Sequence, residues 1–177
     1  MQSTYSTRLS KPKSIAEMPA DARVWVYQSN RELTSEEKNK ILLLANQFIG
    51  SWNAHGADLD AAFDILLDRF LILSVDEQQA SASGCSIDKS VQFMKQLDQQ
   101  FNLNLFDRMQ AAYLVDGKVN VCNIHNLKNE LLQHPSVGVT KINETIVFNN
   151  MITKKNEFDV QWQLPLKSSW HARFVND

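Results

Sequence analysis

The chain has 177 residues, of which 44% are hydrophobic and 21% are charged, and its formal net charge is −2. This length fits one domain with one ordinary core, and the composition excludes a disordered chain, a fibre and a disulfide scaffold. The only acid-free basic stretch is Arg8, Lys11 and Lys13, which argues against binding driven by nucleic-acid phosphates.

The cysteines and the N-terminal sequence predict a cytoplasmic protein. Cys85 and Cys122 lie far apart, so they form neither a secreted framework nor a Cys-x-x-Cys metal site. The N-terminus has no apolar run of signal-peptide length, and no stretch approaches the roughly 18 apolar residues of a membrane span. We therefore expect two free thiols, no membrane span and a cytoplasmic location.

Residues 1–18 are rich in Ser, Lys, Thr and Pro, and we expect them to form a flexible lead-in. Residues 19–177 then form a single α+β domain. The first strand is predicted at Arg23–Gln28, where valines on one face alternate with Trp25 and Tyr27 on the other.

A helix is predicted over residues 35–54. Thr34-Ser-Glu-Glu37 has the spacing of a capping box, in which the Thr and Glu side chains satisfy each other's backbone amides. Apolar residues follow at intervals of three and four, at Ile41, Leu44, Ala45, Phe48, Ile49 and Trp52. Gly56 is expected to end the helix in a left-handed conformation.

Residues 60–76 are predicted to be β-structure. Apolar and other residues alternate near Phe63 and Ile65, and Phe70–Val75 is almost continuously apolar, as in a strand buried on both faces. A tight turn at Asp68-Arg69 would give a hairpin. Arginine is a poor residue for a type I′ turn, so one long bent strand stays open as an alternative.

Ser86 is expected to cap a second helix, whose apolar stripe is Ile87, Val91, Met94, Leu97 and Phe101. Ala112–Cys122 alternates around Asp116-Gly117, a strong turn signal, and predicts two short strands. This order is that of a split βαβ unit. We therefore expect an α+β fold with a ferredoxin-like antiparallel sheet and two main helices on one face.

A C-terminal α/β extension follows this unit. A short helix is predicted at residues 126–133, a strand at 144–151 and a further helix at 153–163, which Pro165 is expected to end.

Two segments are similar to ATP-binding motifs. Leu71–Glu77 resembles a Walker B strand, and Gly84–Ser90 resembles a damaged Walker A loop. The second glycine of a Walker A loop is missing, Lys89 is one position too close, and the two motifs stand in reversed order. These departures argue against P-loop ATPase chemistry.

Several segments nevertheless resemble one known family, at Arg23–Gln28, Ser51–Gly56, Asp68–Glu77, Ala82–Asp88 and Ser169–Phe174. They are similar to short bacterial proteins of unknown role that are commonly labelled "ABC transporter ATPase". The resemblance covers most of residues 19–175. It implies the label but no mechanism and no catalytic residues, and the motifs contradict the label.

Cys85 is the candidate nucleophile. A thiol at a helix N-terminus lies near the positive end of the helix dipole, which favours the thiolate. Gly84 before it and the amide of Ser86 after it suggest an anion site, while Asp88 one turn on opposes a thiolate. The alternative is that Ser86 only caps the helix and Cys85 is a small buried residue.

A cysteine nucleophile needs a base, and His55 and His171 are the candidates. Each lies close to a tryptophan in sequence, so each is also explained as a packed ring. Arg69 and Arg173 are candidate anion clamps, with pairing to nearby aspartates as the commoner use.

Asp76 and Glu77, which end the strand before the second helix, could join the histidines in a mixed nitrogen and oxygen metal site. No pair has a recognised metal-ligand spacing, so no metal and no cofactor are expected.

The first functional hypothesis is a non-catalytic binding or assembly module, because no complete catalytic motif is present. Its partner would be a small molecule or a protein, or a second copy joined through an exposed sheet edge, and not a nucleic acid. The alternative is a small thiol-dependent or anion-binding enzyme that uses Cys85.

Overall fold

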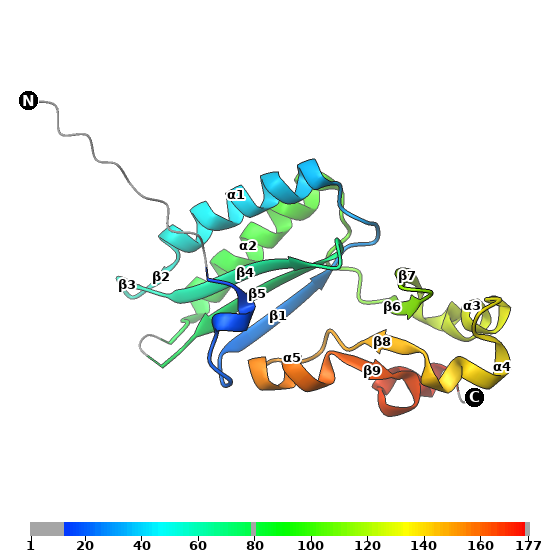
Figure 1. Cartoon of the computed structure of the whole chain (residues 1–177). Coiled ribbons are helices and arrows are strands. Elements are labelled where there is room, and N and C mark those ends of the chain that lie inside the picture. Colours follow the sequence, from blue (N-terminus) through cyan, green and yellow to red (C-terminus); the bar gives the residue numbers. More distant parts are fainter. Residues whose placement is uncertain (1–12, 79–80, 176–177) are drawn as a thin grey trace, which may run out of the picture.

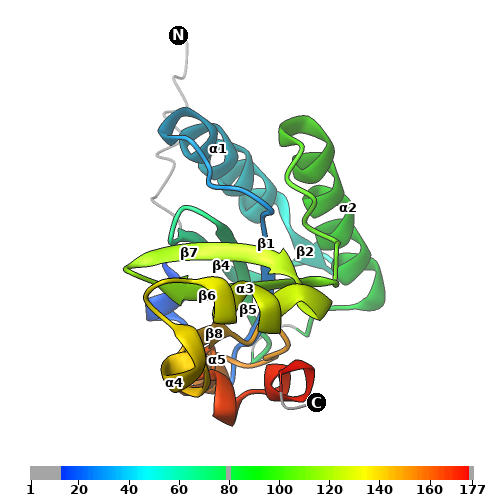
Figure 2. The same ribbon diagram turned by 90° about the vertical axis from the view of Figure 1, so that its right-hand side faces the viewer.

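The computed structural model describes residues 13–78 and 81–175, and its centre is formed by two antiparallel sheets packed against each other (Figures 1 and 2). The first sheet has the order β1–β5–β4, from β1 (Arg23–Gln28), β4 (Asp60–Leu66) and β5 (Phe70–Asp76). The second has the order β7–β6–β8–β9, from β6 (Gln110–Val115), β7 (Lys118–Asn123), β8 (Ile146–Phe148) and β9 (Gln163–Pro165). A short hairpin pairs β2 (Asn53–Ala54) with β3 (Ala57–Asp58).

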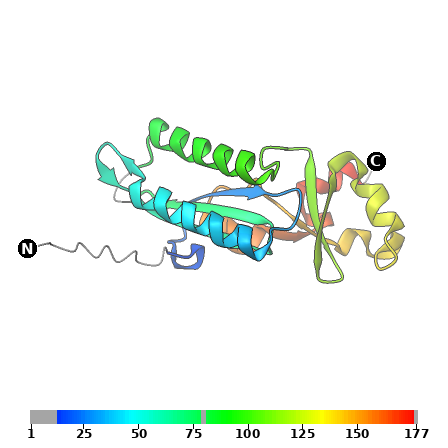
Figure 3. The ribbon, with the colours of Figure 1, turned by 90° about the horizontal axis from the view of Figure 1, so that it is seen from above.

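Helices pack around these two sheets. They are α1 (Ser35–Ser51), α2 (Gly84–Phe101), α3 (Leu127–Gln133), α4 (Gly138–Lys141) and α5 (Lys155–Gln161). Short 3-10 turns complete the chain at η1 (Ile15–Glu17), η2 (Ile124–Asn126), η3 (Ile142–Glu144), η4 (Leu166–Ser168) and η5 (Trp170–Phe174). Seen from above, α1 and α2 lie side by side over the first sheet (Figure 3). None of the helices within these described ranges is long and apolar enough to cross a membrane.

The sheet topology confirms an α+β fold but not the ferredoxin-like arrangement. The order β1–β5–β4 matches the first three strands of such a sheet. The strand expected fourth, β6, pairs instead with β7 and β8 in the second sheet. The alternating pattern of β6 fits a half-buried strand in either sheet, so the sequence pattern did not distinguish the two partners.

β5 is buried on both faces, as its continuous apolar sequence predicted. Leu71, Leu73 and Val75 face a core shared with α1 and α2. Phe70 and Ile72 face a second core shared with the other sheet.

The first helix begins as predicted and ends earlier than predicted. Thr34 and Glu37 form the expected capping box. The helix ends at Ser51, because Trp52 is extended and buried. Gly56 does not end the helix, and instead forms with His55 the left-handed turn between β2 and β3.

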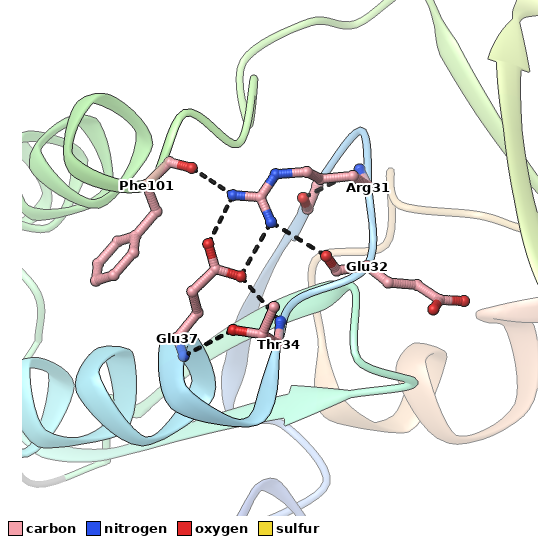
Figure 4. Close-up of polar contacts among 6 residues, drawn as sticks. Arg31, Glu32, Thr34, Glu37 and Phe101 are labelled. Carbon is pink, nitrogen blue, oxygen red and sulfur yellow. Dashed lines mark hydrogen bonds and ion pairs between the residues drawn. The ribbon is translucent and has the colours of Figure 1, made fainter.

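A polar network joins the N-terminus of α1 to the C-terminus of α2 (Figure 4). Arg31 forms a bidentate pair with Glu37, at 3.0 Å and 2.7 Å, and also donates to the carbonyl oxygen of Phe101 at 2.6 Å. Glu37 accepts in addition from the amide of Thr34 at 2.8 Å. Together these donors lower the pKa of Glu37 to about 2, the hydrogen bond from Arg31 being the largest cause.

The lead-in predicted for residues 1–18 differs from the structure over its last residues. Lys13 pairs with β4 at Ala62, and Ile15 and Met18 are buried in the core between the sheets. Ordered packing therefore begins by Lys13, while residues 1–12 lie outside the described chain.

The C-terminal extension follows the predicted order, with α3, β8 and α5 in the expected places. The prediction that Pro165 ends a helix is wrong, because α5 ends at Gln161 and residues 163–165 form β9. β9 pairs only with β8, and an edge strand tolerates a proline that cannot donate a hydrogen bond.

The segment 60–76 is a hairpin, and its turn lies one residue before the predicted one. Leu67 and Asp68 occupy the turn, both with positive φ, at 50° and 51°. The amide of Arg69 closes it by donating to the carbonyl of Leu66 at 3.1 Å. Leucine rarely adopts this left-handed conformation, so the buried strands impose it on the turn.

Replacing Leu67 by asparagine should therefore stabilise the protein. The side chain is 48% exposed, so little packing is lost, and asparagine adopts the left-handed conformation more readily. We expect about 0.5–1 kcal/mol of added stability and a Tm higher by about 1–4 °C in thermal unfolding. The control is Leu43→Asn, at an exposed position inside α1, which should lower the Tm because asparagine is a weaker helix former. An unchanged or lower Tm for Leu67→Asn would contradict the strain assigned to this turn.

Candidate functional site

The residues predicted around Cys85 lie at the start of α2. Ser83, not Ser86, caps this helix, and its Oγ accepts from the amide of Ser86 at 3.2 Å. Ser86 is 1% exposed, and its carbonyl accepts from the indole nitrogen of Trp52 at 2.8 Å. Its amide and carbonyl therefore serve the helix start and the contact with Trp52.

Cys85 itself is exposed, contrary to the alternative of a buried residue. It lies beside an open groove of about 820 Å³ between α1 and α2. Phe48 and Trp52 line this groove together with the charged residues Asp88 and Lys89, but no histidine or arginine of the described chain does. The segment Gly84–Ser90, which resembles a Walker A loop, is entirely helical and so provides no loop to surround a phosphate.

The two candidate histidines lie far apart. His55 is exposed in the β2–β3 turn at one end of the molecule, and His171 lies in η5 toward the other end (Figures 1 and 3). His171 is 2% exposed, its Nδ1 lies 2.7 Å from Ser169 Oγ, and its ring stacks on Trp170. Burial, with a smaller contribution from Arg173, lowers the pKa of His171 to about 4. The imidazole is therefore neutral at pH 7.

The two candidate arginines also differ in environment. Arg69 is buried, donates to the carbonyls of Ser29 and Val119 at 3.4 Å and 3.3 Å, and has its pKa lowered by burial. Arg173 is exposed, and its guanidinium lies over the rings of Trp170 and Phe174. The structure therefore does not bring a histidine and an arginine to Cys85, and the thiol-dependent activity stays a prediction.

The second thiol, Cys122, is half-buried. Burial, followed by the charge of Glu130, raises the pKa of Cys122 to about 11. At neutral pH this residue is therefore almost entirely a thiol, which disfavours a role as nucleophile.

Asp76, the last residue of β5, and Glu77 after it accept hydrogen bonds from backbone amides that follow in the chain. Asp76 Oδ1 accepts from the amide of Gln78, and Glu77 Oε1 accepts from the amide of Ala82, both at 3.0 Å. Within residues 13–78 and 81–175, no three His, Cys, Asp or Glu side chains lie close enough to hold a metal ion.

A second groove, which the sequence did not predict, runs along the outer edge of β1. We call it the β1 groove, and its volume is about 740 Å³. It is lined by β1, Val91 and Lys95 of α2, residues 105–108 and Gln110, residues 148 and 150–153, and Trp170 with His171. It therefore includes one predicted site residue, His171.

The backbone of β1 is unpaired over the middle of this groove. Odd-numbered residues of β1 bond to β5, so the amides and carbonyls of Val24, Val26 and Gln28 point to the outer edge. At one end Val24 donates to the carbonyl of Thr153, and beyond the other end Asn30 donates to the carbonyl of Leu103, each at 2.9 Å. Val26 makes no backbone hydrogen bond on this side to any described residue.

A chain of hydrogen bonds fixes the side-chain amide of Gln28 in this groove. The indole nitrogen of Trp162 donates to Asn150 Oδ1 at 3.1 Å, and Asn150 Nδ2 donates to Gln28 Oε1 at 2.8 Å. Because an indole nitrogen can only donate, the orientation of both amides follows from it. Gln28 Nε2 is left as a buried donor with no partner in the described chain.

Gln110 supplies the complementary group. Its Nε2 donates to Asp107 Oδ2 at 3.1 Å, and a carboxylate can only accept, so the amide orientation is again fixed. Gln110 Oε1 is thereby left as a buried acceptor without a partner in the described residues. Two residues that line the β1 groove thus carry one unused donor and one unused acceptor, both buried.

The charges of the groove are mainly positive. Arg23, Lys95 and Arg108 line it, against the single carboxylate of Asp107. Asp107 already accepts from Gln110 and from the amide of Met109. Lys95 and Arg108 form no ion pair with any residue in the described ranges.

Sequence reasoning had no signal for Gln28 or Gln110. Glutamine belongs to no motif at these positions. The orientation of the Gln28 amide depends on Asn150 and Trp162, far along the chain, and that of Gln110 on Asp107, three residues before it. Comparisons with protein families, with curated proteins and with solved structures found no match to this chain.

Proposed function

We propose that this protein is a non-catalytic binding module that holds its ligand in the β1 groove. The observation that carries the proposal is the pair of buried, unpartnered amide atoms, Gln28 Nε2 and Gln110 Oε1. A buried polar atom without a partner destabilises a protein by about 1–3 kcal/mol, and a ligand that satisfies both atoms removes that penalty.

The groove also has the usual composition of a ligand site. Apolar side chains such as Val26 and Phe148 line it together with a few fixed polar groups. His171 also lines the groove, and because its pKa is lowered to about 4 its ring is neutral at pH 7. One unused donor and one unused acceptor, from two residues that line the same groove, match a ligand that carries an amide group.

The proposal extends to the arrangement of strands in the first sheet. We regard the first sheet as a ferredoxin-like sheet in which β1, β5 and β4 keep their places. The fourth position of such a sheet lies beside β1, where this protein has the groove. Binding at that position would explain why β6 lies elsewhere.

The test is an NMR titration of ¹⁵N-labelled protein with N-acetyl-alanine N′-methylamide, a single blocked residue. We expect a saturable shift of the side-chain amide signal of Gln28, with affinity on the order of millimolar for so small a probe. Gln28→Met should abolish the shifts around the groove. Gln47→Met, the same change in the groove between the helices, should leave them unchanged. Shifts that do not saturate, or that survive Gln28→Met, would refute the proposal.

A further inference from the structure

We propose that the ligand of the β1 groove is an extended acidic polypeptide segment that pairs with β1 as an added strand. This inference rests on the proposed function and specifies its partner. It is carried by three features of the groove: the unpaired backbone edge, the closed ends of that edge, and the surplus of positive charge.

The backbone edge supplies the pairing groups. The carbonyl of Val24, the amide and carbonyl of Val26 and the amide of Gln28 all point away from β5. An exposed edge of this kind is a template for one further strand, and peptide ligands use such edges by forming main-chain hydrogen bonds. The edge of the sheet that β1 forms is visible in Figure 1, where the connection from β8 to α5 runs beside it.

The closed ends limit the length of the added strand. Thr153 covers the edge at Val24, and Leu103 covers it at Asn30. At about 3.3 Å per residue, the stretch between them accepts about four or five residues. A folded second copy would have to reach this recessed stretch with a whole edge strand, so a short extended peptide is the better fit.

The charge of the groove selects the peptide. Lys95 and Arg108 have exposed side chains and no ion-pair partner among the residues described. Phe106 and Met151, 40% and 72% exposed, give the same groove two apolar contacts. Side chains of a bound strand alternate between its two faces. A segment in which acidic and apolar residues alternate therefore matches both kinds of contact.

The experiment compares two blocked pentapeptides, acetyl-Val-Glu-Val-Glu-Val-amide and its lysine counterpart, by NMR titration and amide hydrogen exchange. We expect the acidic peptide to bind at least about tenfold more tightly than the lysine peptide. It should slow exchange at the amides of Val26 and Gln28, which point to the groove. The amides of Trp25 and Tyr27 already bond to β5 and should not change.

Two sets of variants sharpen this test. Two N-methylated forms of the acidic peptide are compared, one methylated at its second and fourth residues and the other at its third. Because alternate amides of a strand face the partner, one of these forms should bind about tenfold more weakly than the unmodified peptide, and the other should bind nearly as well. Replacing both Lys95 and Arg108 by glutamine should weaken the acidic peptide by about threefold or more. Lys89→Gln, on the same helix but in the other groove, should have no effect.

Each remaining outcome has a definite meaning. Equal binding of both peptides, insensitive to N-methylation, would overturn the added strand while the groove remained a ligand site. If the protein responds to the blocked alanine probe but to neither pentapeptide, the added strand is also overturned while the groove remains a ligand site. Self-association that protects Val26 would make the occupant a second copy and overturn the acidic partner. If no probe affects the groove, both the inference and the proposed function fail.

Discussion

Trp162→Ala should lower the free energy of unfolding by about 3–5 kcal/mol, a large effect for a single substitution. Trp162 is 4% exposed and lies between the two sheets. Its ring meets Phe70 and Phe148 edge-on, at 5.1 Å and 5.2 Å between centroids, and stacks on Phe158 at 4.7 Å. Alanine removes all three contacts and leaves a cavity at the junction of β5, β8 and α5.

Urea and thermal unfolding would measure this effect, with an expected fall in Tm of roughly 10 °C for a chain of this length. Trp170→Ala is the matched control. That indole also donates to an asparagine, Asn149, at 3.1 Å, but its side chain is only half-buried, so the loss should be nearer 1–2 kcal/mol. Equal losses for the two variants would contradict the central place assigned to Trp162.

The conservative variant Trp162→Phe separates packing from positioning. Phenylalanine keeps most of the ring contacts but cannot donate to Asn150, which then no longer fixes the amide of Gln28. We expect a smaller stability loss, accompanied by weaker binding of the blocked alanine probe. Unchanged binding would mean that Gln28 does not depend on this chain of hydrogen bonds.

The second large effect concerns Arg31 and depends on pH. Arg31→Gln should lower the free energy of unfolding at pH 7 by about 1–2 kcal/mol, because it breaks the bidentate pair with Glu37 and the bond to the C-terminus of α2. The Arg31 side chain is 41% exposed and that of Glu37 is 22% exposed. Screening by solvent therefore keeps the effect well below that of a buried pair.

The sign of the pH dependence follows from the lowered pKa of Glu37. This carboxylate has a pKa of about 2 in the folded protein and its ordinary value of 4.5 when unfolded. The stability that it contributes is complete above about pH 4.5 and is lost as the pH falls toward 2. The difference between the wild-type chain and Arg31→Gln should therefore shrink over this range in urea unfolding. Lys40→Gln, which breaks an exposed pair with Glu36, should leave stability nearly unchanged at every pH. A constant difference between pH 7 and 2 for Arg31→Gln would contradict the assignment.

The elements that the sequence predicted correctly depend on local signals. The capping box at Thr34 and the Asp116-Gly117 turn each lie within four residues of chain, and both are present. The turn at Leu67 carried no such signal, because the pairing of β4 with β5 forces a leucine into a conformation that its own preferences oppose. The cap of the second helix was predicted at Ser86 and lies at Ser83, because both residues are serines that can cap a helix.

The features that the sequence could not predict depend on contacts between distant segments. Nothing in β6 itself distinguishes pairing with β1 from pairing with β8. The candidate site was chosen from residue types with known chemistry, Cys85 and the histidines, and the fold separates them. The atoms that now carry the proposal belong to two glutamines. The amide of Gln28 is oriented by Asn150 and Trp162 from a distant segment, whereas that of Gln110 is oriented by Asp107 only three residues away.

The two-sided burial of β5 determines how this protein can unfold. Its even- and odd-numbered residues belong to different cores. Neither core can open without disturbing β5, and with it the side chains that β5 contributes to the other core. The helical layer and the second sheet should therefore lose their structure in a single cooperative transition rather than one after the other. The slowest-exchanging amides should be those of β5, the strand on which both layers depend.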